Sequence, residues 1–504
     1  MKKVTTVIIM LLCTVAIFAA KPRDISGLLT LKGELKQTYQ SYPKGEPLIV
    51  SQVVEAYDDG TTRGYIQYII NIGHIQYGLT PKEFSRYVTL APAESDTEFW
   101  QQVYLNERIY EYFFKKGYRN NLRQEANEEC RKYLEQIDTF LCKDDFVNSY
   151  VQNIFAKIIT GIKDSKRHEA LNVRVVQALD PEAYMLTNGS MIVSTGMLAL
   201  LDSDEELAAI MSNELAHYVM DDPIDNIRRS ISRNNRSHFW GAFLTGFAEG
   251  MLDSGYYYDD LGSTAVGTVA AVGAVSVLLS AKAIDFLGLS YNEKQDVTAD
   301  RIACDWLAFK QMKPEALSSA LSKITWFYVA RGTRDKLARY ESAERLRARI
   351  KQLPQPEKEL KSRAYLRAMT DIVSSNALGS LEEKQYKAAI ELAQKNIDNK
   401  FPSDHDYVVL VKAKMALDNT AEVNDECMAL LEKAKVLGGN VANLDINKQE
   451  ILLLLRMNKQ LQAAHALEEY LSLLDMRLKE GGDEAWTKEE TTWAQQLLAK
   501  INRI

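Results

Sequence analysis

The stretch that decides the fold is "DSDEELAAIMSNELAHYVM", Asp202 to Met220. Its carboxylates come first and apolar residues follow at spacings of three and four, which predicts a capped amphipathic helix. Within it, the run from Asn213 to His217 reads Asn-Glu-x-x-His. A helix reading His-Glu-x-x-His would place two zinc-binding imidazoles on one face, beside a glutamate that activates a metal-bound water. The first imidazole is replaced here by an amide.

The segments around this helix add a strand, a turn and a second helix. "LNVRVVQALDPEAYMLTNGSMIVSTGMLALL", Leu171 to Leu201, begins with strand-like alternation, turns at "TNG" and continues with a short strand, Met191 to Ser194. Further on, "DVTADRIACDWLA" lies in a predicted helix that contains Asp296 to Phe309. Metallopeptidases built on two helices take a carboxylate ligand from such a second helix.

The composition is that of an ordinary folded protein with two or three domains. The chain has 504 residues, 46% of them hydrophobic, and a net charge of −7 from 61 basic and 68 acidic residues. There is no long single-sign run, so we expect neither nucleic acid nor an electrostatically bound anionic lipid surface as a partner.

The first twenty residues, "MKKVTTVIIMLLCTVAIFAA", have two lysines before an apolar run and two alanines at the end. This layout predicts a secretory signal peptide, and hence a protein exported to the periplasm or cell envelope. An uncleaved membrane anchor is the alternative. The four later cysteines form no Cys-x-x-Cys pair, which argues against a cysteine zinc site; Cys130 and Cys142 are a candidate disulfide, and four small buried side chains are the alternative.

The pattern along the chain predicts four parts: a signal peptide at 1–20, a small β-rich module at 21–100, a mainly helical domain at 101–355, and a helical array at 356–504. The β-rich module includes a hairpin around an Asp-Asp-Gly turn. The array consists of amphipathic segments joined by short polar links, which favours a tetratricopeptide-like arrangement over a simple bundle.

The helical domain contains an aromatic- and glycine-rich insertion at 234–292. Its uncharged run "TAVGTVAAVGAVSVLLSA", Thr264 to Ala281, is long enough to be a transmembrane candidate. Its Ala, Gly and Val content favours burial within the domain or in a partner groove instead, so membrane contact through this run stays an alternative.

Taken in order, the strand and hairpin, the helix with Asn213, the run "DVTADRIACDWL" and the run "YESAERLRARI" resemble the gluzincin family of HtpX and the CAAX prenyl proteases. The resemblance covers Asn172 to Leu353 and is closest to the exported, repeat-bearing BepA-like members. It implies an α+β chain: a mainly helical zincin-like metallopeptidase domain with a small β-sheet, between the β-rich module and the helical array. Zinc is the cofactor that it implies.

Position by position, the resemblance gives Glu214 the role of general base and His217 that of second zinc ligand. Asn213 falls on the first ligand and Asp296 on the third, where the family has His and Glu. An amide oxygen is a much weaker zinc donor than an imidazole, and aspartate shortens the carboxylate arm by one methylene. We therefore expect zinc to bind weakly or not at all.

Two further positions match groups that support the chemistry. Asp300 matches an aspartate that orients a ligand, and Arg339 falls where the family has a histidine that stabilises the oxyanion. An arginine has the charge for that task. The other histidine near the site in sequence is His238, in the insertion, and a loop rarely supplies the geometry of a ligand.

These departures from the family pattern fall on residues that would contact the metal or the transition state, whereas the segments that position the site match the pattern. The favoured hypothesis is an exported pseudopeptidase that binds extended or misfolded envelope polypeptides by β-strand addition, while its helical array docks a protein partner. The first alternative is an active metalloendopeptidase that uses Glu214, His217, Asp296 and a third donor. The second is an integral membrane member of the family, for which 264–281 would have to span the bilayer.

Overall fold

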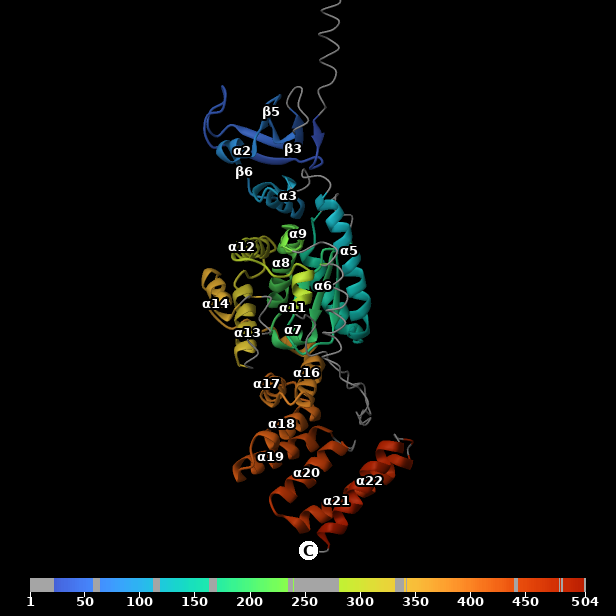
Figure 1. Cartoon of the computed structure of the whole chain (residues 1–504). Helices are drawn as coiled ribbons and strands as arrows, with labels where there is room; N and C mark the ends of the chain where they lie inside the picture. Colours follow the sequence, from blue (N-terminus) through green and yellow to red (C-terminus); the bar gives the residue numbers. More distant parts are fainter. Residues whose placement is uncertain are drawn as a thin grey trace, which may run out of the picture.

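The structure is a computed structural model that describes residues 22–57, 64–111, 118–162, 170–233, 239, 281–330, 340, 342–438, 443–479, 481 and 484–502. The predicted signal peptide, His238, Arg339 and all but the last residue of the run Thr264 to Ala281 lie outside these ranges. A β-rich part, a mainly helical part with a small sheet, and a series of helices follow one another along the molecule (Figure 1).

The β-rich part is an antiparallel sheet. It comprises β1 (Arg23–Asp24), β2 (Leu31–Leu35), β3 (Pro47–Tyr57), β4 (Gly64–Ile72), β5 (Ile75–Leu79) and β6 (Val88–Leu90). The order is β5-β4-β3-β2-β6, with β1 beside β3. The pairing of β3 with β4 confirms the predicted hairpin, although its turn lies outside the described residues. Alternate residues of β4 are buried, and Tyr68 packs edge-on against Phe84 of helix α2 (Pro81–Tyr87).

The middle part holds a three-stranded sheet in the order β7-β9-β8, formed by β7 (Asn172–Val176), β8 (Ala183–Met185) and β9 (Ser190–Ser194). β9 runs parallel to β7 and antiparallel to β8. The turn at "TNG" is confirmed, with Gly189 at a positive φ of 81°, and β8 and β9 are the antiparallel strands on either side of it.

Between β6 and Leu353, the described elements outside this sheet are helices. They are α3 (Asp96–Asn106), α5 (Tyr118–Ile137), the 3-10 turn η1 (Asp138–Phe140), α6 (Asp145–Ile158), α7 (Thr195–Leu200), α8 (Asp204–Val219), α9 (Asp222–Arg233), α11 (Ala281–Phe286), α12 (Glu293–Phe309), α13 (Ala316–Ala330) and α14 (Ala343–Gln352). In Figure 1, α8 lies among α6, α9, α12 and α13, and all four contact it.

Helix α8 begins where the sequence predicts. The Ser203 hydroxyl accepts a hydrogen bond from the backbone of Glu206, and three carboxylates occupy the first turn, where the helix dipole favours them. The expected amphipathic character is wrong, because every residue from Glu206 to Val219 is buried. Contacts with β8 and with helices on several sides cover the face that was expected to meet solvent. The polar side chains of α8 therefore lie inside the domain.

The C-terminal helices are α15 (Arg363–Ala368), α16 (Thr370–Glu382), α17 (Tyr386–Asp398), α18 (Asp404–Leu417), α19 (Ala421–Gly438), α20 (Leu444–Arg456), α21 (Gln460–Lys479) and α22 (Glu484–Ile501). From α16 on, each packs on the next, and α16 contacts α18 as α18 contacts α20. The predicted helical segments of this part are confirmed as helices.

One buried apolar cluster runs from the β-rich part to the first C-terminal helices. It contains Tyr68 of β4, Leu215 of α8, and Tyr365 and Val373 of α15 and α16. The Tyr365 hydroxyl also donates a hydrogen bond to the backbone oxygen of Leu198 in α7. The start of the helical array is thus packed into the same core as α8.

Two predictions about cysteines and membrane segments can be compared with the described residues. Cys130 and Cys142 are both free thiols, and so are Cys304 and Cys427. Three of the four are buried, whereas Cys304 is half-buried, so the reading of small buried side chains holds for three. Within the described ranges, no helix has both the length and the apolar character needed to cross a bilayer.

Candidate functional site

Three predicted site residues lie on one stretch of α8, at positions i, i+1 and i+4. Asn213, Glu214 and His217 are 5%, 4% and 1% exposed. Helix α12 packs along α8 and carries Asp296 and Asp300, which are also buried. Residues that the sequence assigned to one site thus lie on two helices in direct contact.

The imidazole of His217 is held from three sides. Its Nδ1 lies 2.9 Å from Oδ2 of Asp222, and its ring stacks on that of Tyr291 with centroids 3.6 Å apart and planes 7° from parallel. Its Nε2 lies 3.6 Å from Oδ1 of Asp296. Asp222 is itself fixed, since Gln295 donates to its Oδ1 at 2.9 Å. The orientation of the imidazole is therefore fixed by its neighbours.

Asp296 pairs with two arginines of α14. A nitrogen of Arg345 pairs with its Oδ2, and Nη1 of Arg349 lies 3.4 Å from its Oδ1. Arg345 also donates to the backbone oxygen of Tyr291 at 2.8 Å, next to the imidazole stack. The carboxylate predicted as third ligand is thus already neutralised by guanidinium groups.

Asp300 is bound in the same way. Arg349 donates through Nε to Oδ2 at 2.9 Å and through Nη2 to Oδ1 at 2.7 Å, a bidentate pair. Burial by itself lowers the pKa of Arg349, but the charges of Asp300 and Asp296 outweigh it and raise the pKa above its usual value. Arg349 is only 5% exposed and remains a cation inside the domain.

Asn213 uses its amide as a donor. Its Nδ2 donates to Oδ1 of Asp300 at 2.8 Å, so the carboxylate that would orient a ligand instead binds the amide and Arg349 together. The three helices α8, α12 and α14 meet at Asp300 through these bonds.

These contacts decide whether zinc fits. Two ligands of one tetrahedral zinc ion, each bound at about 2.0–2.2 Å, stand roughly 3.3 Å apart, so the 3.6 Å between His217 and Asp296 suits a shared ion. The remaining donors fit poorly, because Asn213 would offer only an amide oxygen, a weak zinc donor, and Asp296 is paired with arginine. Among the described residues, no cluster of three or more His, Cys, Asp and Glu side chains could hold a metal ion. The donors that the described residues place around His217 therefore fit a zinc centre poorly.

The sequence did not identify several residues of this site. Asp222 and Tyr291, which fix the imidazole, carry no spacing signal. Arg345 and Arg349 lie within the quoted run "YESAERLRARI", and their i, i+4 spacing places both on one face of a helix. That spacing was the one available signal, but it is equally typical of a solvated face.

A second polar cluster lies at the other end of α8. Glu206 precedes His217 by eleven residues, about 16 Å along the helix. Lys323 of α13 bridges Glu206 and Asp202 at 2.7 Å each. Lys395 of α17 donates to the backbone oxygens of α7 and of the residue after it, and pairs with Asp202 at 2.8 Å. This cluster joins the array to the helical domain.

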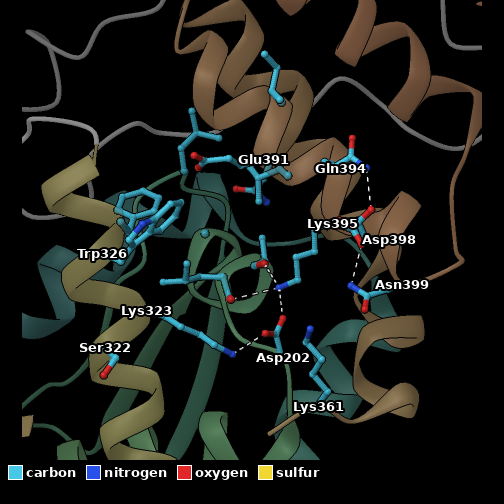
Figure 2. A pocket seen from close by; sticks show the side chains of 18 residues that line it. Asp202, Ser322, Lys323, Trp326, Lys361, Glu391, Gln394, Lys395, Asp398 and Asn399 are labelled. Carbon is cyan, nitrogen blue, oxygen red and sulfur yellow. Dashed lines mark hydrogen bonds and ion pairs between the residues drawn. The ribbon is translucent and has the colours of Figure 1, made fainter. Parts of the chain in front are cut away.

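A cavity of about 640 Å³ opens beside this cluster, between α7, α13 and α17 (Figure 2). Apolar side chains such as Phe327 and Ile390 line it together with Lys361, and the indole of Trp326 is 52% exposed at its wall. It is remote from His217 and Asp296, so it is a separate feature from the predicted site.

Comparison with known proteins bears on the middle part of the chain. Residues 146–366 match the model described as Peptidase family M48, a match that begins in α6, includes α8, α12 and α14, and ends in α15. No curated protein is similar enough to the chain to count as a match. The family match supports a metallopeptidase-like domain of the gluzincin type at residues 146–366.

Proposed function

We propose that the chain is an exported pseudopeptidase of this type. Its M48 domain binds extended or misfolded envelope polypeptides without hydrolysing them, and the helices from α16 to α22 form a tetratricopeptide-like array that docks a protein partner. The observation that carries the proposal is the use of the ligand positions: Asn213 donates to Asp300, and Asp296 pairs with Arg345 and Arg349. Asp296 is thus neutralised by arginine, and Asn213 could offer an ion only its amide oxygen.

Binding of an extended polypeptide requires backbone groups and no metal, since the peptide adds a strand to a sheet. The strand that we assign to this role is β8, which ends the described order β7-β9-β8 and packs against α8. The succession of helices after α15 supports the array, because paired helices of this kind present extended concave surfaces. Membrane contact through 264–281 stays an alternative to this proposal, and carbonate extraction of membranes tests it.

One observation favours the alternative of an active metalloendopeptidase. The 3.6 Å between His217 Nε2 and Asp296 Oδ1 suits two ligands of one ion, and Glu214 lies on the same helix in the position of the general base. A third donor would have to join them, and Asp296 would have to exchange its arginine partners for the ion.

The two candidates are separated by incubating the full mature chain with fluorescently labelled casein, an unfolded substrate, with and without added zinc. Anisotropy measures binding and gel electrophoresis measures cleavage. We expect saturable binding, intact casein in both buffers, and the same affinity for Glu214→Gln. Cleavage that zinc supports and Glu214→Gln abolishes would establish the peptidase, and absence of binding would refute the polypeptide-binding proposal.

A further inference from the structure

We propose that the guanidinium groups of Arg345 and Arg349 take the place of the metal ion, as a built-in cation that joins α8, α12 and α14. The inference concerns what holds these helices together, so it does not depend on whether the domain binds a polypeptide. It has two consequences: the site is stabilised by arginine, and an imidazole restored at position 213 does not by itself recover a metal site.

The first argument is the burial of like charges. Asp296 and Asp300 are one turn apart on α12 and are 3% and 5% exposed. Two carboxylates at this spacing repel each other, and burying them without a cation costs more than burial of apolar groups returns. The cations that pair with them come from α14, which places Arg345 and Arg349 against the two carboxylates.

The second argument is geometry. Arg349 binds both oxygens of Asp300 at 2.9 and 2.7 Å, and its third nitrogen lies 3.4 Å from Asp296. A planar guanidinium with five donors serves two carboxylates at once in this way. Arg345 takes the other oxygen of Asp296. Both carboxylates therefore have their charge balanced by arginine.

The third argument is competition. A divalent ion between His217 and Asp296 would meet the Arg349 nitrogen that lies 3.4 Å from the same carboxylate oxygen. Two like charges that close in a poorly solvated interior repel strongly, so the ion and the guanidinium exclude each other. An imidazole at position 213 would supply a donor but would leave the arginine in place.

The first test is thermal unfolding of the full chain in chelator-containing buffer. Arg349→Met leaves two buried carboxylates with a single cation, and removal of one partner of a buried pair corresponds to a fall of roughly 6–20 °C in Tm for a domain of this size. Arg349→Lys keeps the positive charge but loses the bidentate contact, so its Tm should fall by less. The matched control is Arg347→Met on the same helix, where the side chain is half exposed and no change is expected.

A fall for Arg349→Met no larger than for Arg347→Met would overturn the proposal. So would equal losses for Arg349→Lys and Arg349→Met, because the charge would then be irrelevant. If Arg349→Met does not fold, the comparison of Arg349→Lys with Arg347→Met still decides, since a lysine that melts no lower than the control would show that the bidentate contacts contribute nothing.

The second test is zinc content, by plasma mass spectrometry, after dialysis against zinc. We expect no bound zinc in Asn213→His and near-stoichiometric zinc in Asn213→His combined with Arg349→Met. Stoichiometric zinc in Asn213→His alone would contradict the exclusion of the ion by Arg349. A folded double variant that takes up no zinc would contradict it as well. Neither result depends on casein binding, so this inference and the proposed function are tested separately.

Discussion

Replacing Lys395 by Met tests how the C-terminal helices are attached to the helical domain that precedes them. The ammonium group donates to the backbone oxygens of Ala199, Leu200 and Leu201 at 2.6, 3.2 and 2.8 Å. It also pairs with Asp202 at 2.8 Å (Figure 2). The first two of these oxygens belong to the last turn of α7, where a cation also interacts favourably with the helix dipole. The Lys395 side chain is 16% exposed, so in the methionine variant water can replace few of these interactions.

Truncation of one partner of a buried pair costs about 3–5 kcal/mol, and we take about 3 kcal/mol because Lys323 still neutralises Asp202. At about 2–4 °C per kcal/mol, Tm should fall by about 6–12 °C. The assay is thermal unfolding followed by circular dichroism, with Lys387→Met on the exposed face of the same helix as control. A loss below about 1 kcal/mol, or one equal to that of the control, would refute the reasoning.

Two further substitutions test neighbouring features. Burial alone would raise the pKa of Asp202, but Lys395 and Lys323 outweigh it and hold the pKa below its usual value. The stability that Asp202 contributes is therefore complete above about pH 4 and is lost as the pH falls through the lower pKa of the folded state. In urea unfolding between pH 5 and 3, the difference in unfolding free energy between the unmodified protein and Asp202→Asn should shrink. A constant difference would contradict this. Gly196→Ala should lower the free energy of unfolding in urea by about 2 kcal/mol, because the new Cβ would lie 2.3 Å from a backbone oxygen. The control is Gly438→Ala, where the nearest atom is 3.6 Å from the new Cβ. Equal stability of the two alanine variants would disprove the steric argument.

The sequence predicts the helix of the site well, because its signals are local. Ser203 caps it and three carboxylates occupy its first turn, as the pattern requires. Its complete burial was missed, since the same apolar spacing fits a helix with one solvated face. Burial on all sides depends on α6, α9, α12 and α13 surrounding α8, and the sequence of α8 carries no information on that.

The arginine contacts were missed for a related reason. Arg345 and Arg349 share a face of α14, but charged residues at this spacing are normally solvated. What places them against Asp296 and Asp300 is the packing of α14 beside α12, and these pairs are 49 residues apart. The sequence pattern therefore indicates the missing imidazole but not the cations that the fold places beside the carboxylates.

The attachment of the array was beyond sequence reasoning altogether. Lys395 and Asp202 lie far apart in the chain, and each belongs to an ordinary charged surface pattern when read locally. In the structure the pair joins α17 to the end of α7, beside the cavity with Trp326. The roles of Arg339 and His238 stay predictions, because both residues lie outside the described ranges.

The most direct test of the pseudopeptidase account is the zinc and manganese content of the unmodified mature protein, purified without chelators and measured by plasma mass spectrometry. The account predicts far less than one metal ion per chain, and the same trace amount in His217→Ala. Close to one ion per chain, lost in His217→Ala, would contradict it, because His217 and Asp296 would then hold a metal despite the arginines that pair with Asp296.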